Sequence, residues 1–159
     1  MIPYGRHNVT WADALKVLWQ VRFKSLTQGE EIENFEKQVA EYVGAKYAVA
    51  VSSATAGLHL AAIALRLPLE SKVLTSPISF VASSNSLLYA HYKPEFVDID
   101  NKTLNMNIDL VESKILIDKK IRAILPVHFA GLACDMKRIH DVAARHSLRV
   151  IEDAAHALG

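Results

Sequence analysis

Apolar residues recur at helical spacing in some segments of the chain and form short continuous runs in others. Thr10 and Asp13 form a capping-box pattern in front of apolar residues at helical spacing, which predicts a helix over 10–23. The same spacing over 32–42 predicts a second helix, and Gly44 is a suitable residue to end it.

Further along the chain, short valine-rich runs alternate with helical segments. Residues 47–51 form such a run, which is typical of a buried strand, and residues 58–65 return to helical spacing. Asp109 and Glu112 form a second capping-box pattern, which predicts a helix near 110–117. The other predicted elements are strands over 72–75, 94–100, 121–127 and 149–153, a helix over 80–90, and a helix capped by Asp135 with Met136, Ile139 and Val142 on one face.

The repeated order of strand and helix predicts an α/β fold. Such an order favours a mostly parallel sheet with helices on both faces, which is a three-layer αβα arrangement. One uncharged stretch, 47–65, approaches the length of a membrane span. Polar residues in its middle, among them Ser52, Ser53 and His59, would be costly in hydrocarbon, so we interpret it as strand, turn and helix.

Composition narrows the class of protein. The 159 residues are 51% hydrophobic, which excludes a disordered chain, and the net charge of +1 argues against a strongly basic nucleic-acid-binding protein. We expect neither a nucleic-acid nor a membrane partner. The lone cysteine, Cys134, excludes an internal disulfide framework and favours a reducing compartment, so we expect a cytoplasmic protein in which this thiol is an apolar filler.

Candidate chemistry lies just after the predicted strands, because ligands of open parallel sheets bind outside the carboxyl ends of the strands. The residues concerned are 52–57, 76–80, 98–100, 128–131 and 152–156. The first of these segments is a turn of small residues that leads into a helix. Its free N–H groups favour phosphate binding, to which Thr55 could add a hydroxyl, although tight strand–helix packing explains the pattern equally well.

Three of these segments contain side chains with more than one interpretation. Glu152 and Asp153 alternate to opposite faces of a strand, so they do not share a proton; a buried Asp153 needs a cation, either a protonated ligand nitrogen or an arginine. Phe80 is either a ring that stacks on a flat cofactor or a core residue. His128 is either an acid–base group or a buried histidine whose ring is fully hydrogen-bonded. No metal-ligand spacing is present.

Several motifs, taken in order, resemble one family over the whole chain. They are Ser52-Ser53-Ala54-Thr55-Ala56-Gly57-Leu58-His59, Thr75-Ser76-Pro77-Ile78-Ser79-Phe80-Val81-Ala82-Ser83, Phe96-Val97-Asp98-Ile99-Asp100, Pro126-Val127-His128-Phe129-Ala130-Gly131 and Ile151-Glu152-Asp153-Ala154-Ala155-His156-Ala157, preceded by Ile2-Pro3-Tyr4-Gly5-Arg6 and Leu26-Thr27-Gln28-Gly29. In this respect the chain is similar to the DegT/DnrJ/EryC1/StrS aminotransferases, which are pyridoxal 5′-phosphate (PLP) enzymes of the aspartate aminotransferase fold (fold type I). The resemblance implies an N-terminal arm and helix over 1–30 and an incomplete large PLP-binding domain over 31–159.

The resemblance also implies roles for particular residues. Ala54 and Thr55 would hold the cofactor phosphate, and Phe80 would stack on the pyridine ring. Asp153 would pair with the ring nitrogen and keep it protonated, so that the ring acts as an electron sink. His156, where many members have glutamine, would lie near the phenolic oxygen of the ring.

The same resemblance implies an aminotransferase that moves an amino group from glutamate to a nucleotide-linked 4-keto-6-deoxy sugar, as a homodimer in the intact family. The Schiff-base lysine of the family lies beyond Gly159, and Lys46, Lys72 and Lys93 do not stand in a matching context. We therefore expect the chain alone to be inactive. One alternative is a non-catalytic remnant or a fragment of a split gene. The other is an unrelated Rossmann-type domain. A glycine fingerprint would favour the second alternative, and this chain has no such fingerprint.

Overall fold

A computed structural model describes residues 8–27 and 29–158 of the chain. The chain divides into two compact units, residues 1–50 and 51–159, which are described separately below. The domain boundary expected near residue 30 stays a prediction, and the motif residues 2–6 and Gln28 lie outside the described part. Among the described residues, no helix is long and apolar enough to cross a membrane.

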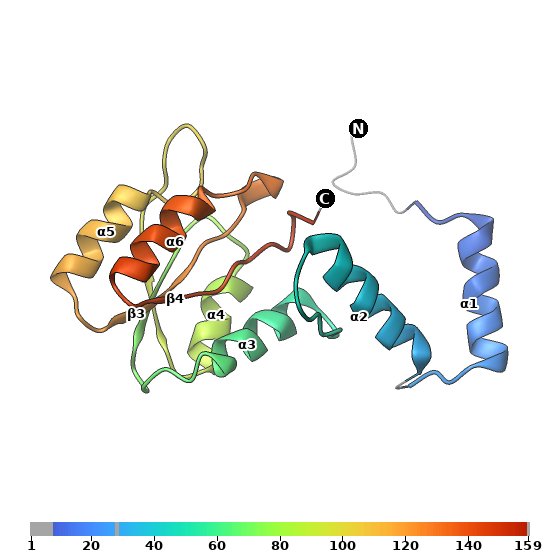
Figure 1. Cartoon of the computed structure of the whole chain (residues 1–159). Helices are drawn as coiled ribbons and strands as arrows, with labels where there is room; N and C mark the ends of the chain where they lie inside the picture. Colours follow the sequence, from blue (N-terminus) through green and yellow to red (C-terminus); the bar gives the residue numbers. More distant parts are fainter. Residues whose placement is uncertain (1–7, 28, 159) are drawn as a thin grey trace. The chain divides into compact units, whose positions relative to one another are not determined.

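The first unit consists of α1 (Trp11–Phe23) and α2 (Glu30–Val43) (Figure 1). The predicted capping box is confirmed, because the Thr10 amide donates to Asp13 Oδ2 at 2.8 Å and the Asp13 amide donates to Thr10 Oγ1 at 3.3 Å. The predicted end of the second helix is also confirmed: Gly44 has a left-handed backbone with φ 68°, which glycine adopts without steric cost.

The strand predicted over 47–51 is wrong, because no strand of the described residues pairs with this segment. A strand exists only when its N–H and C=O groups meet those of a neighbour. The Ala50 amide instead donates to the side chain of Glu36, at 2.7 Å from Oε1. The apolar side chains of Tyr47 and Val49 are consequently exposed.

The second unit alternates helices and strands, as predicted (Figure 1). Its strands form one four-stranded sheet in the order β2-β1-β3-β4, and every neighbouring pair is parallel. The elements are α3 (Ala54–Ala64), β1 (Lys72–Thr75), α4 (Ala82–Tyr89), β2 (Lys93–Phe96), α5 (Ile108–Ile117), β3 (Ile121–Leu125), the short 3₁₀ helix η1 (Phe129–Gly131), α6 (Met136–Arg145) and β4 (Arg149–Val150).

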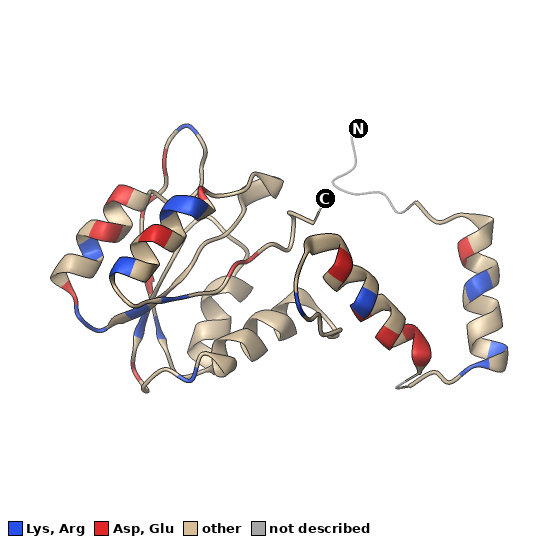
Figure 2. Cartoon of the chain, in the orientation of Figure 1, with Lys and Arg blue, Asp and Glu red and all other residues tan. Residues whose placement is uncertain are grey.

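The central strands send alternate side chains into two separate cores. Leu74 of β1 and Ile124 of β3 pack with residues of α5 and α6 on one face of the sheet. Val73 and Leu125, one position away, pack with residues of α3 and α4 on the other face. This alternation follows from the period of two in a strand, and it confirms the three-layer αβα arrangement. Figure 2 shows that the two helical layers differ, since α3 and α4 carry no Lys, Arg, Asp or Glu.

Two helices of this unit begin earlier than the sequence pattern indicated. α3 begins at Ala54 rather than near residue 58, because Ser53 Oγ accepts a hydrogen bond from the Ala56 amide at 3.2 Å. The predicted cap of α5 at Asp109 is wrong. Asn107 caps this helix, since its Oδ1 accepts from the Asp109 amide at 3.0 Å. A short polar side chain placed two residues earlier thus reaches the free amides of the first turn.

The predicted strands near the sheet's carboxyl edge are too long. β3 ends at Leu125 and β4 at Val150, and beyond them a single bridge joins Val127 to Asp153. Pro126 lies directly after β3 and has no N–H to donate, which interrupts the ladder. Beyond the strands, the two segments stay joined by backbone hydrogen bonds from Asp153 to Pro126 and from His128 to Asp153.

An ion-pair network lies around Lys72 at the beginning of β1. Lys72 Nζ lies 2.8 Å from Asp118 Oδ2 and 3.2 Å from Glu95 Oε2, and Lys114 Nζ lies 2.7 Å from Glu95 Oε1. The hydrogen bond from Lys72 lowers the pKa of Asp118, and those from Lys114 and then Lys72 lower the pKa of Glu95. Both carboxyl groups therefore stabilise the folded state in their ionised form.

We expect the free energy of unfolding of the second unit to fall as the pH is lowered from ~5 to ~3. Carboxyl groups with a lowered pKa contribute stability above their unfolded values of about 4, and this stability is lost as they become protonated. Lys72→Met should flatten this dependence in urea-unfolding measurements. Lys93→Met, which removes an exposed pair with Glu70, is the control and should leave it unchanged. An unaltered slope for Lys72→Met would contradict the assignment.

Candidate functional site

The carboxyl ends of β1, β3 and β4 meet at one edge of the parallel sheet, and the candidate residues follow these ends. Residues 76–80 come after β1, residues 128–131 after β3, and Asp153 shortly after β4. The Asp153 amide donates to the Pro126 carbonyl at 2.9 Å, and the His128 amide donates to the Asp153 carbonyl at 3.1 Å. These backbone hydrogen bonds hold the segments after β3 and β4 side by side.

The carboxylate of Asp153 is buried and bonded to neutral donors. The residue is only 7% exposed. Its Oδ2 accepts a hydrogen bond from Ser83 Oγ at 2.6 Å, and its Oδ1 accepts one from the Ala155 amide at 3.2 Å. A carboxylate offers about four lone-pair sites, so about two remain for a further donor.

Asp153 has no cationic partner among residues 8–27 and 29–158, where the ion pairs involve other acidic groups. The arginine considered from the sequence is therefore not found in this part of the chain. A buried carboxylate is unfavourable unless a cation or strong donors compensate it. Glu152 points the other way, as predicted: it is exposed, and its Oε2 lies 3.1 Å from His128 Nε2.

Phe80 is 73% exposed, which argues against the core interpretation. The turn that carries it is held by Ser76, whose Oγ accepts from the Ile78 amide at 3.2 Å. The Phe80 carbonyl oxygen lies 3.1 Å from Ser83 Oγ, and the same Oγ atom bonds to Asp153. The structure thus brings the Phe80 segment and Asp153 together through Ser83.

Ser83 ends one of the motifs that carry the family resemblance, but the sequence analysis gave it no role. It lies 1% exposed in the first turn of α4, and its hydroxyl also bonds to that of Ser79. The two serines are four residues apart on either side of Phe80. Paired serines around the start of a helix are a usable signal, but they are also common as ordinary capping residues.

Ala54 and Thr55 occupy the first turn of α3. The first amides of a helix have no acceptor within it, and the helix dipole favours an anion there. α3 packs against α4, and Leu58 and Ala62 share a core with Leu87. The candidate phosphate site therefore lies on the helix next to the one that follows Phe80.

His156 is exposed, and its backbone contacts the segment after β3. A Cβ atom on Gly131 would lie 2.9 Å from the His156 carbonyl oxygen, and Gly131 has a φ of +88°. Glycine is thus required for two reasons at the same position. The His156 backbone therefore packs closely against Gly131.

His128 is a buried histidine whose ring nitrogens are both hydrogen-bonded. Its Nδ1 accepts from the Cys134 amide at 3.1 Å, so Nε2 carries the proton that faces Glu152. Burial raises the pKa of the Cys134 thiol to about 11, which agrees with a filler rather than a nucleophile.

Asn105, which sequence reasoning missed, bonds to both ends of η1. Its Oδ1 accepts from the Phe129 amide and its Nδ2 donates to the Leu132 carbonyl, each at 3.0 Å.

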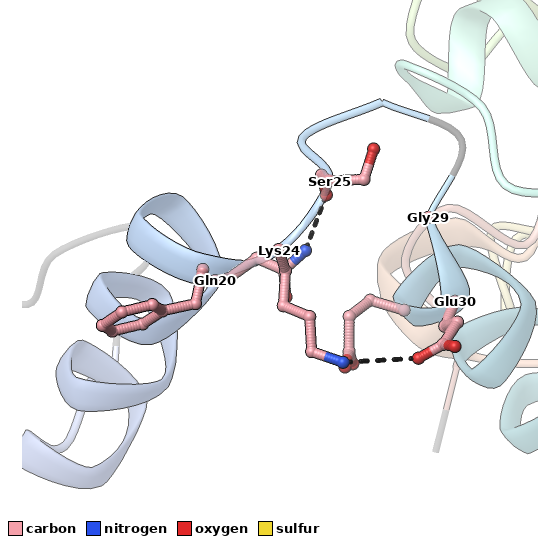
Figure 3. Close-up of a pocket in the computed structure, with 7 residues that line it drawn as sticks. Gln20, Lys24, Ser25, Gly29 and Glu30 are labelled. Carbon is pink, nitrogen blue, oxygen red and sulfur yellow. Dashed lines mark hydrogen bonds and ion pairs between the residues drawn. The ribbon is translucent and has the colours of Figure 1, made fainter.

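A separate groove lies within the first unit, between the end of α1 and the beginning of α2 (Figure 3). Its volume is about 310 Å³. Gln20 Nε2 donates to the Ser25 carbonyl at 2.8 Å, and Lys24 Nζ lies 3.4 Å from Glu30 Oε2. The hydrogen bond holds the segment after α1 against that helix, and the ion pair joins the end of α1 to the beginning of α2. This ion pair is exposed to solvent, which limits its contribution to stability.

Comparisons with known proteins agree with this arrangement. The chain is 44% identical over 157 residues to the spore coat polysaccharide biosynthesis protein SpsC of Bacillus subtilis, covering 99% of this chain and 40% of that protein. It is 36% identical over 160 residues to the UDP-4-amino-4,6-dideoxy-N-acetyl-beta-L-altrosamine transaminase of Campylobacter jejuni, covering 100% of this chain and 42% of that protein. The solved structure of Helicobacter pylori PseC, an aminotransferase involved in the biosynthesis of pseudoaminic acid, matches with a TM-score of 0.93 and 32% identity, covering 99% of this chain and 42% of that one.

The chain thus spans about two fifths of the length of these relatives. The model of one protein family matches residues 11–159, which includes nearly every described residue. The fold, the order of the motifs and the relatives point to the same group of proteins. The chain belongs to the DegT/DnrJ/EryC1/StrS aminotransferase family.

Proposed function

We propose that this chain provides the cofactor-binding part of a PLP-dependent aminotransferase that acts in the cytoplasm on a nucleotide-linked 4-keto-6-deoxy sugar, with glutamate as amino donor and a homodimer as the working form. The observation that carries the proposal is the buried carboxylate of Asp153, which has only neutral donors among the described residues. A protonated ring nitrogen would supply the missing cation. The family and the transaminase from Campylobacter jejuni support the reaction and the sugar class.

The residues present fit PLP in chemical character. The amides of Ala54 and Thr55 begin a helix and suit a phosphate dianion. The exposed ring of Phe80 offers a flat apolar surface for a pyridine ring. Asp153 would bind the ring nitrogen, and His156 would donate to the phenolic oxygen.

Bound PLP would supply an electron sink that stabilises negative charge on the carbon atom whose amino group is transferred. The contribution of this chain is to hold the group and control one proton. Asp153 would keep a proton on the ring nitrogen, and its burial would protect that pair from competing water. The α3 amides would donate hydrogen bonds to the phosphate, and Phe80 would provide the apolar surface against the ring.

The lysines near the site in sequence are engaged elsewhere. Lys72 pairs with Asp118 and Glu95, and Lys93 pairs with Glu70. Lys46 belongs to the first unit, where its Nζ lies 5.1 Å from the centre of the Tyr47 ring. We therefore expect the Schiff-base lysine of the proposed enzyme not to be among these residues, and the 159 residues alone not to complete the reaction.

We expect the 159-residue chain to bind PLP only weakly, without a specific imine, and to show no transamination with glutamate and a UDP-linked 4-keto sugar above the rate of free cofactor. Borohydride reduction and peptide mapping should label several lysines weakly, because no lysine is matched to the site. A single dominant labelled lysine, or turnover above the free cofactor, would contradict the proposal. Failure to bind PLP would favour the non-catalytic remnant instead.

A further inference from the structure

We propose that Ser83 is a positioning residue for the cofactor site: its hydroxyl sets the orientation of the Asp153 carboxylate toward the cofactor ring nitrogen and couples it to the segment that carries Phe80. This inference rests on the proposed function, since it concerns the same site. It assigns a role to a side chain that is 1% exposed and cannot itself serve as a surface contact.

The Ser83 hydroxyl has one proton to donate, and more than one acceptor lies within its reach. Its Oγ lies 2.6 Å from Asp153 Oδ2 and 3.1 Å from the Phe80 carbonyl oxygen. A hydrogen bond to a charged acceptor is the stronger one, so the Ser83 proton goes to Asp153. The Ser79 hydroxyl bonds to Ser83 Oγ and can donate to it, which makes a chain that runs from Ser79 through Ser83 to Asp153.

The carboxylate of an aspartate needs such bonds to hold one orientation. The torsion that turns its oxygens is broad rather than confined to three wells. Ser83 holds Oδ2, and the Ala155 amide holds Oδ1 at 3.2 Å. With both oxygens held, the remaining lone pairs have a fixed direction before any ligand arrives, which reduces the cost of binding.

The same helix provides a matched control in Ser86. This residue is also a serine of α4 and is 0% exposed, but its Oγ donates to the Ser83 carbonyl at 2.9 Å rather than to Asp153. Ser83→Ala and Ser86→Ala therefore remove the same atom from equally buried positions. Only the first removes a hydrogen bond to the carboxylate.

The test measures the affinity of the 159-residue chain for pyridoxamine phosphate and for its 1-deaza analogue, in which a C–H group replaces the ring nitrogen. Neither ligand needs a lysine. We expect the unmodified chain to bind pyridoxamine phosphate more tightly than the deaza analogue. Ser83→Ala should lower the affinity for pyridoxamine phosphate about ten-fold and leave the affinity for the deaza analogue unchanged. Ser86→Ala should change neither affinity.

A spectroscopic measurement separates orientation from a general loss of structure. The ¹⁵N shift of the bound ring nitrogen should report its deprotonation at lower pH in Ser83→Ala than in the unmodified chain or Ser86→Ala. If Ser83→Ala does not fold, Ser83→Cys keeps a similar volume with a weak donor, and it should lose the preference in the same way.

The outcomes distinguish this inference from the proposed function. Equal weakening of both ligands by Ser83→Ala would mean a purely structural role and would overturn the inference. An unmodified chain that prefers pyridoxamine phosphate, with the preference kept in Ser83→Ala, would overturn the inference alone. An unmodified chain that binds neither ligand, or both equally, would overturn the assignment of Asp153 as well.

Discussion

Asp153→Asn should weaken the binding of pyridoxamine phosphate by about 30-fold or more, because removing one member of a buried, hydrogen-bonded charge pair costs ~2–5 kcal/mol. The carboxylate is 7% exposed, so water screens it poorly. Asparagine keeps the size of the side chain but carries no charge to hold a proton on the ring nitrogen. Isothermal titration of the chain with the ligand measures the effect.

The adjacent residue supplies the control. Glu152 lies on the opposite side of the same backbone and is exposed beside His128. Glu152→Gln should therefore leave the affinity for pyridoxamine phosphate within about two-fold, as is usual for a surface change away from the ligand. Equal losses in the two variants would show that Asp153 has no special relation to the ligand.

The stability of Asp153→Asn provides a second and opposite expectation. The carboxylate is buried with neutral donors, Ser83 Oγ and the Ala155 amide. Neutralising a charge in such a place removes a desolvation cost, so we expect the free energy of unfolding to stay the same or rise. A residue that serves binding is often retained although it lowers stability. A marked loss of stability in Asp153→Asn would instead indicate that the carboxylate has a structural role.

The sequence pattern was sufficient to predict the layers of the fold and the opposite directions of the adjacent carboxylates Glu152 and Asp153. β1 was predicted with the observed ends, and the alternation along β1 and β3 explains both cores. The same period of two separates Glu152 from Asp153. Local spacing determines these features, so no knowledge of distant contacts is needed.

Features that depend on distant contacts could not be predicted in this way. Ser83 and Asp153 are 70 residues apart in sequence, and their hydrogen bond exists only because α4 and the segment after β4 meet. The error over 47–51 has a related cause. Composition shows that a segment suits a strand, but a ladder requires a neighbour, and no described strand provides one there.

Gly131→Ala should lower the free energy of unfolding of the second unit by about 2–4 kcal/mol, which is at the high end for a single substitution. A left-handed backbone costs a residue with a Cβ about 1–2 kcal/mol, and the φ here is +88°. The new Cβ would also lie 2.9 Å from the His156 carbonyl oxygen. Since that atom belongs to backbone rather than to a flexible side chain, the segment itself must move.

Gly57→Ala is the matched control, because it adds the same methyl group in the same unit with the opposite expectation. Gly57 lies inside α3, and its new Cβ would meet only Val51 Cγ2 at 3.4 Å. Alanine is a better helix former, so the free energy of unfolding should rise by ~0.5–1 kcal/mol. Urea unfolding measures both variants. A small effect of Gly131→Ala would mean that the segment at His156 shifts easily, and the proposed position of His156 beside the cofactor would then lose its structural basis.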